Sequence, residues 1–346
     1  MRSSAIKRES FRAADYALFA ALTLAVMLVC IGAGSVNVPL SQTAGVLWNA
    51  LTGQPQPGGT AVPIILSARL PRVLCVALVG ASLSIGGGAM QGLLKNPLAD
   101  GTTLGVSGGA SLGAVIAMTF GITIPGLPFA GTMAMAMLFA FLSLIIILSL
   151  AYRLDYSLST NTIILLGVIY SMFVSSVVAL LTTFAGERVR DITFWLMGSL
   201  AGSSYMNAAV LAGMALACGG VLLCRARELN AFAIGEDNAR HVGVNVRRVK
   251  LTVLIAVAAL IGVCVSVSGM IGFVGLVTPH MLRMVVGPNH KRLLPATMFG
   301  GACFLMLADL AARTILSPRE LPIGVVTSFI GAIIFLSIFF RMRRGR

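Results

Sequence analysis

The sequence has few charged residues for its length. Asp, Glu, Lys and Arg make up 10% of the 346 residues, whereas a typical soluble domain has about 25%. Hydrophobic residues make up 58%, and the mean hydropathy is +0.96. This composition argues strongly against a water-soluble globular fold.

Residues that commonly carry chemistry are also sparse or badly spaced. The six cysteines form no Cys-x-x-Cys pair and lie in or beside apolar runs, which favours packing over a disulfide or metal role. His241, His280 and His290 are scattered, so we predict no metal site and no cofactor. The sequence has no Walker A loop, so we do not expect the chain itself to bind ATP by that route.

Apolar runs of about 20 residues recur along the whole chain. This pattern is typical of a polytopic helical membrane protein. We therefore predict an all-α fold surrounded by membrane lipid, with short helices in the connections near 35–67 and after 185. The ten transmembrane helices are expected at 16–34, 71–94, 103–121, 129–152, 159–184, 205–224, 251–268, 272–286, 294–316 and 322–340.

Basic residues are distributed unevenly between the two sides of these predicted spans. Of the 25 Lys and Arg residues, 19 fall in the tails and connections on one side and 6 on the other. By the positive-inside rule the first side is cytoplasmic, and so are both termini. The net charge of +14 then reflects membrane topology, and we predict no nucleic-acid partner. The chain reads as one membrane domain: a tail at 1–14, spans in 16–224, a charged connection at 225–250, spans in 251–340 and a tail at 341–346.

Glycine is concentrated between residues 69 and 113, where an Asn96-Pro97 break separates two apolar runs. Interior glycine destabilises an isolated helix by about 0.5–1 kcal/mol relative to alanine. In a membrane, however, small residues let helix backbones approach closely. A weak similarity between the two halves of the chain predicts an inverted repeat of five spans each. We expect helix packing at Gly86, Gly88, Gly92, Gly105, Gly109 and Gly113.

Several ordered motifs resemble one protein family, and the resemblance covers nearly the whole chain. They are RLPR at 69–72, GASLSIGGGAMQGLLKNPLAD at 80–100, LGVSGGA at 104–110, GFVGLVTPHMLR at 272–283, ADLAAR at 308–313 and LPIGVVTSFIGA at 321–332. They are similar to those of the FecCD-type permeases, the membrane subunits of binding-protein-dependent ABC importers for ferric siderophores, haem and cobalamin. The resemblance implies a bacterial inner-membrane subunit that forms a homodimer, with two cytoplasmic ATPase subunits and an extracytoplasmic substrate-binding protein. ATP hydrolysis would then take place on the partner subunits, so the chain itself would not be an enzyme.

The resemblance also implies roles for three groups of residues. Arg69, Arg72 and Arg313 would form salt bridges with the binding protein, although arginines at this depth also snorkel to lipid headgroups. The turns at 96–99 and 158–161 would form a cytoplasmic gate, although such breaks are commonly only loops. Residues 229–250 would dock on the ATPase, although a charge run is commonly only a solvated loop. The expected gate residues are Asn96, Pro97, Leu98, Thr160 and Asn161, and the expected coupling residues are Ala233, Ile234, Gly235, Glu236, Ala239, Arg240 and Gly243.

The sequence departs from the family pattern at two positions, and it leaves two functions other than an ABC permease open. Gly101 and Ile333 stand where the family commonly has proline, which leaves the details of the path unsettled. An ion-coupled secondary transporter would need ionisable groups at membrane depth, and Asp309, close to Arg313, is the plausible candidate. The sequence around Ser107 matches G-x-S-x-G, but the strand-turn-helix setting and histidine partner of a hydrolase are not apparent.

Overall fold

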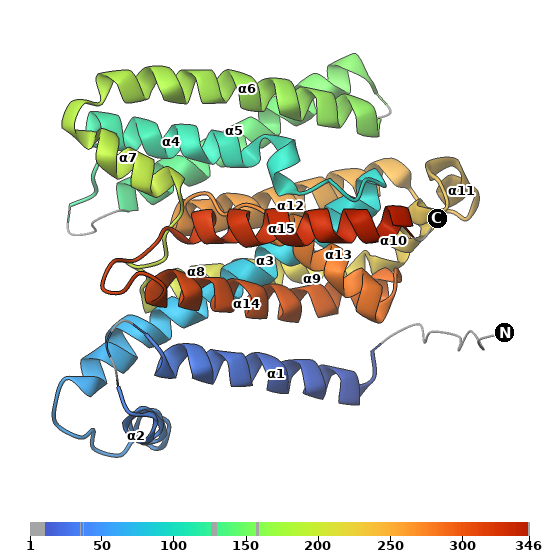
Figure 1. The fold of residues 1–346 in the computed structure, drawn as a ribbon. Helices are drawn as coiled ribbons and strands as arrows, with labels where there is room; N and C mark the ends of the chain where they lie inside the picture. Colours follow the sequence, from blue (N-terminus) through green and yellow to red (C-terminus); the bar gives the residue numbers. More distant parts are fainter. Residues whose placement is uncertain (1–10, 35, 37, 126–129, 157–158, 345–346) are drawn as a thin grey trace.

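The computed structural model describes residues 11–344 except 35, 37, 126–129 and 157–158. Its described elements are helices, with no β-strand among them, as the sequence predicts (Figure 1). Most of the predicted N-terminal tail lies outside the described residues, as do residue 158 of the second predicted gate turn and the last two residues of the C-terminal tail.

Each of the ten predicted spans corresponds to a helix or to a continuous run of helices. The spans are α1 (Ala13–Gly32), η1 (Pro63–Arg69) with α3 (Leu70–Leu94), α4 (Val106–Phe120), α5 (Ala130–Leu154), α6 (Thr160–Phe184), α8 (Tyr205–Met214) with η4 (Ala215–Gly219) and α9 (Gly220–Cys224), α12 (Val246–Ser268), α13 (Val274–Val286), α14 (His290–Thr314) and α15 (Ile323–Arg344). The connections contain α2 (Leu40–Thr52), η2 (Gly101–Leu104), η3 (Gly186–Arg188), α7 (Val189–Leu196), α10 (Ala226–Ala233) and α11 (Glu236–His241).

The spans differ in length. Among the described residues, seven of them are long and apolar enough to cross a membrane, and α4, α13 and the apolar part of α15 are shorter. The 13 residues of α13 extend about 20 Å at 1.5 Å per residue, less than the roughly 30 Å of a bilayer core. Short helices of this kind occur where the backbone around them is buried in protein rather than exposed to lipid.

The second span begins earlier than the sequence indicates. The prediction placed its start at Pro71, but the helix begins at Pro63 and passes through the π-helical η1 before α3. Proline is compatible with the first turn of a helix, where its missing N–H removes no hydrogen bond. Arg69 and Arg72 therefore lie within a continuous helix and not at its beginning.

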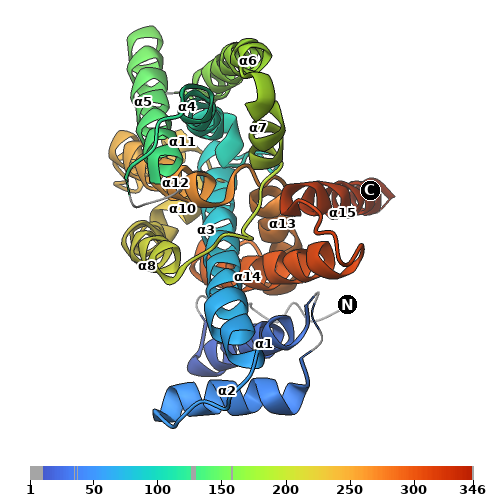
Figure 2. The same ribbon diagram turned by 90° about the vertical axis from the view of Figure 1, so that its left-hand side faces the viewer.

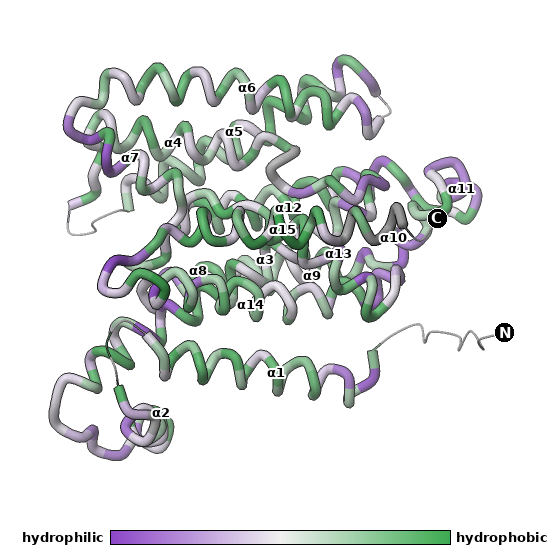
Figure 3. The backbone as a smooth tube through the Cα atoms, viewed as in Figure 1, coloured by the Kyte–Doolittle hydropathy of each residue, from purple (hydrophilic) through white to green (hydrophobic). Residues whose placement is uncertain are grey.

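The helices α3 and α12 form the centre of the bundle, and α1, α5 and α6 lie at its periphery (Figure 2). In α3 and α12, 78% of the most apolar stretch is buried, against 11% in α1 and 22% in α6. The exposed faces of the peripheral helices remain apolar along their length, and hydrophilic residues collect at the two ends of the bundle (Figure 3). This distribution is the one expected of a protein whose sides face lipid.

The two ends of the bundle carry different elements. One end, here the α10–α11 end, holds both short helices of the 225–250 connection, the beginning of α1 and the end of α15 (Figure 1). The opposite end, the α2–α7 end, holds α2, α7 and the connection between α14 and α15. Polar side chains cap the N-termini of α6 and α12 at the α10–α11 end. The Ser159 side chain accepts a hydrogen bond from Thr162 N, and the Asn245 side chain accepts one from Arg248 N. Such N-caps stabilise a helix by about 1 kcal/mol each.

Glycine lets α3 approach its neighbours at backbone distance. A Cβ atom at Gly80 would overlap the carbonyl of Gly301 in α14, and one at Gly87 would overlap the carbonyl of Gly275 in α13. By contrast, a Cβ at Gly86 would meet only the Val257 side chain at 3.5 Å. The close approaches therefore depend on particular members of the Gly86–Gly88 triplet.

Candidate functional site

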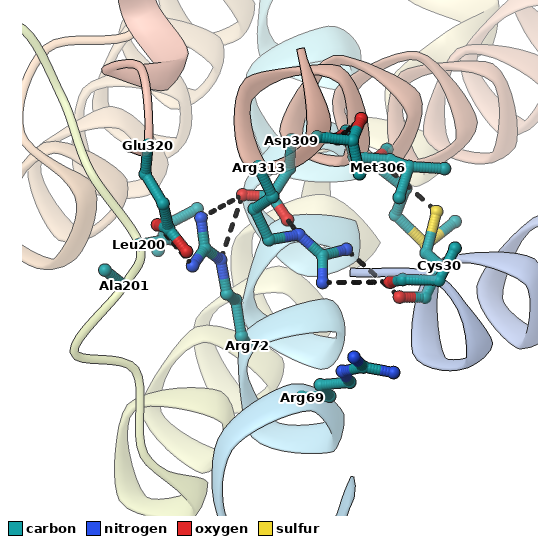
Figure 4. Close-up of polar contacts among 12 residues, drawn as sticks. Cys30, Arg69, Arg72, Leu200, Ala201, Met306, Asp309, Arg313 and Glu320 are labelled. Atoms are coloured by element: carbon teal, nitrogen blue, oxygen red, sulfur yellow. Dashed lines mark hydrogen bonds and ion pairs between the residues drawn. The ribbon is translucent and has the colours of Figure 1, made fainter. Parts of the chain in front are cut away.

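Arg72 of the RLPR motif lies in a buried ion cluster at the α2–α7 end, and Arg69, also buried, lies beside this cluster (Figure 4). The Arg72 guanidinium donates to Asp309 Oδ1 from Nε at 3.0 Å and from Nη2 at 2.9 Å, and from Nη1 to Glu320 Oε2 at 2.8 Å. Arg313 forms an ion pair with the other oxygen of Asp309 at 3.0 Å. One carboxylate on α14 thus binds two arginines from two helices.

Arg69 and the remaining donors of this cluster bind the C-terminal end of α1. Arg69 donates to the carbonyl oxygens of Ile31, Gly32 and Val36, and Arg313 donates to that of Cys30 at 3.0 Å. The Cys30, Ile31 and Gly32 carbonyls lie at the C-terminus of α1, where the helix dipole favours a positive charge, and Val36 lies just beyond it. The cluster and Arg69 therefore attach the peripheral α1 to α3 and α14.

The three predicted docking arginines are all turned inward. The exposed fractions of Arg69, Arg72 and Arg313 are 6%, 8% and 3%, and all three donate hydrogen bonds to groups of the same chain. Docking through these side chains remains a prediction, and in this conformation it would require them to leave internal partners. The sequence indicated the Asp309–Arg313 pair through its spacing of four residues, but it gave no signal for the bond between Arg72 and Glu320.

A cavity of about 690 Å³ lies between α3, α12, α13 and α15, with α7 and η2 at its edge. Its lining is mainly apolar, and the polar side chains in it are Asp100, Ser107 and Ser328. Both positions that depart from the family pattern, Gly101 and Ile333, contribute to this lining. A Cβ atom at Gly101 would overlap the side chain of Ile261, which also lines the cavity. The residue at position 101 therefore affects the shape of the cavity directly.

Ser107 lies in the first turn of α4, after Gly105 with its φ of 70°. The residue is 7% exposed and borders the cavity. Its surroundings are helical, so the strand-turn-helix arrangement that a nucleophilic serine of this motif uses is not present in the described residues. Gly109 and Gly113 on the same helix lie against the α5 backbone at Phe139 and Met135.

The predicted gate residues form two capped turns. Asn96 Oδ1 accepts a hydrogen bond from Leu98 N at 2.9 Å after Lys95 ends α3 with a φ of 49°. In the second turn, Asp155 Oδ2 accepts bonds from Ser159 N and Thr162 Oγ1. Pro97, Leu98 and Asn161 are exposed, and η2, just after the first turn, packs against α6, which the second turn begins. The gating role of these residues remains a prediction.

The predicted coupling segment forms two short helices joined at Gly235, whose φ of 119° disfavours other residues. Phe232 and Ala239 are buried against the bundle, and Ile234 is 62% exposed at the turn. Glu236 forms an ion pair at 2.8 Å with the buried Lys250 of α12. Ala233, Arg240 and Gly243 are exposed at the same end. An exposed surface is available there for a partner, as the docking prediction requires.

Sequence comparison identifies the family. The model of the FecCD transport family matches residues 22–341. The chain belongs to this family. It is therefore the multi-pass permease subunit of an ABC transporter of the FecCD type, and the resemblance drawn from its motifs is confirmed.

Relatives of this FecCD permease are named for different cargoes, and one is named for none. This permease is 39% identical to an uncharacterized ABC transporter permease of Bacillus subtilis, covering 98% of the chain and 97% of that protein. It is 38% identical to a hemin transport system permease of Yersinia pestis, and the match covers 93% of this chain and 96% of that protein. A cobalamin import system permease of Halobacterium salinarum is 37% identical, and the match covers 85% of this chain and 79% of that protein.

A solved structure described as an inward-facing conformation of a putative metal-chelate type ABC transporter matches the FecCD permease with a TM-score of 0.84. The two are 30% identical, over 95% of this chain and 100% of that one. This match confirms the predicted fold class, a helical ABC permease; the inverted repeat stays a prediction.

Proposed function

We propose that this permease imports an iron chelate, with a ferric siderophore as the first candidate and haem or cobalamin as the others. The observation that carries the proposal is the match over 95% of the chain to a structure described as a metal-chelate type transporter. The cavity of about 690 Å³ supports it, because pockets for small organic ligands measure roughly 300–1,000 Å³.

The working assembly in this proposal has two copies of the chain in a bacterial inner membrane. Two cytoplasmic ATPase subunits bind the α10–α11 end, and an extracytoplasmic binding protein delivers cargo to the α2–α7 end. The exposed Ile234 and Arg240 suit a protein contact at the first end, and the charge bias of the sequence supports this orientation. ATP hydrolysis on the partners would alternate access to the path between the two copies.

Reconstituted transport tests the proposal. The permease is incorporated into liposomes with its ATPase and binding protein, and uptake of a labelled ferric siderophore, haemin and cobalamin is compared. We expect ATP-dependent uptake of one cargo, abolished by a non-hydrolysable ATP analogue. Uptake driven by an ion gradient in vesicles without the ATPase would instead support a secondary transporter. Transport that survives Ser107→Ala would exclude a hydrolytic role for this serine.

A further inference from the structure

The first short helix of the 225–250 connection is bonded directly to the beginning of α14. Asn230 of α10 accepts a hydrogen bond at Oδ1 from the backbone N–H of His290 at 2.8 Å, and His290 Nδ1 lies 2.9 Å from the same oxygen. The Asn230 Nδ2 group donates to Asn289 Oδ1 at 2.8 Å. Both polar ends of one asparagine side chain are therefore used to hold α10 on α14, about 60 residues away in the sequence.

The same histidine also contacts α3. His290 is 5% exposed, and a Cβ atom at Gly92 of α3 would overlap its Nε2. The imidazole thus fits against the α3 backbone at a position that has no side chain. Any displacement of His290 by α10 would press on α3 or pull away from it.

Beyond this point α3 and α14 stay in close contact along the bundle. Gly80 and Gly301 bring the two backbones together near the middle, where a Cβ on either glycine would overlap the other helix. At the α2–α7 end, Arg72 of α3 is bonded to Asp309 of α14. Close-packed helices with charged pairs at the end shift as a unit more readily than they separate, because protein interiors have few voids into which a side chain could move.

The second short helix is attached to a different part of the bundle. Glu236 of α11 binds Lys250 of α12 at 2.8 Å, and Gly235 separates α11 from α10 with a φ of 119°. The two short helices therefore have separate attachments on either side of a glycine, α10 to α14 and α3, and α11 to α12.

We propose that Asn230 and His290 transmit movement of α10 to the α3–α14 pair, which carries it to the ion cluster at the α2–α7 end. Both are positioning residues for transport and touch neither ATP nor cargo. This inference rests on the proposed function, because it needs an ATPase that moves α10.

The experiment uses the full assembly of permease, ATPase and binding protein in liposomes, with Asn230→Ala and His290→Ala variants. The Asn230 and His290 side chains bond to each other and to the beginning of α14, not to the exposed surface of the α10–α11 end. We therefore expect the variants to assemble with the ATPase and to keep basal ATP hydrolysis within about twofold. Stimulation by the loaded binding protein and transport per ATP should each fall at least about fivefold, the lower end of typical coupling between distant sites. The double variant should be no worse than the more impaired single variant, because both residues belong to one link.

Three further variants separate transmission from a general structural role. Thr252→Ala removes a side-chain bond at the same end, but that bond joins Thr252 to Arg248 within α12, so coupling should be unchanged. Asn230→Asp keeps the acceptor for His290 and should retain more coupling than Asn230→Ala. Gly92→Ala should displace the imidazole and lower coupling as His290→Ala does.

The outcomes distinguish this inference from the proposed function. If the wild-type chain fails to assemble with an ATPase, or its uptake is independent of ATP, the proposed function fails and the inference with it. If the wild type is coupled and Asn230→Ala retains full stimulation and transport, the transmission role alone is wrong. Loss of ATPase assembly in Asn230→Ala would make Asn230 a docking residue and would also overturn the role proposed here.

Discussion

Asp309 holds the ion cluster at the α2–α7 end together, because its two oxygens serve Arg72 and Arg313 separately. Its exposed fraction is 1%, whereas the side chain of Glu320, the other acid of the cluster, is 36% exposed. The two acids bind the same arginine but differ in how much water surrounds them. Since water screens an exposed pair and leaves a buried one unscreened, their contributions to stability should differ.

We predict that Asp309→Asn destabilises the protein by about 3–5 kcal/mol, because it leaves the buried Arg313 without a carboxylate and Arg72 with Glu320 alone. Glu320→Gln, the matched control, should cost about 1 kcal/mol or less. Thermal unfolding of the purified permease in detergent measures both. Equal shifts in Tm for the two variants would show that the buried carboxylate is not the centre of the cluster.

Helix contacts at the scale of elements depend on single glycines. Gly86 and Gly87 are neighbours in α3, yet only Gly87 faces the backbone of α13. Successive residues of a helix point about 100° apart, so adjacent positions cannot occupy the same contact.

Gly87→Ala should therefore lower stability by about 1–3 kcal/mol or prevent folding, since the Gly275 backbone cannot yield to a methyl group. Gly86→Ala meets only the Val257 side chain at 3.5 Å and should be neutral, or stabilising by up to about 1 kcal/mol from helix propensity. Yield of monodisperse protein and Tm in detergent report both changes. The reverse order of effects would place the triplet in a different helical register.

The sequence was informative about elements and less so about contacts between them. Apolar runs predict the ten spans, because a segment that crosses lipid must pair its own backbone N–H and C=O groups and therefore forms a helix. The glycine-rich stretch predicts close packing, but it does not show which glycine meets which neighbouring helix, since helix register depends on partners far away in the chain. The arginine motif was recognised, but its internal partners were not, because Asp309 lies 237 residues after Arg72 and nothing local indicates the pairing.

At the scale of the whole molecule, orientation can be tested with a native cysteine. Cys224 ends α9 and is exposed, whereas Cys30, Cys75 and Cys264 are buried. If the α10–α11 end is cytoplasmic, a membrane-impermeant maleimide should label Cys224 only after spheroplasts are permeabilised. A cysteine introduced at Gln54, after α2, should be labelled in intact spheroplasts. Labelling of Cys224 from outside would reverse the proposed orientation.

The ion cluster has a further consequence for how this protein is made. Arg69 and Arg72 are synthesised with the second span, but Asp309 emerges from the ribosome 237 residues after Arg72. At roughly 5–20 residues per second, Arg72 waits about 10–50 s for this carboxylate. The carbonyl groups of α1 that bind Arg69 are already made when Arg69 emerges. A chain truncated before α14 would therefore leave Arg72, and not Arg69, without its buried partner.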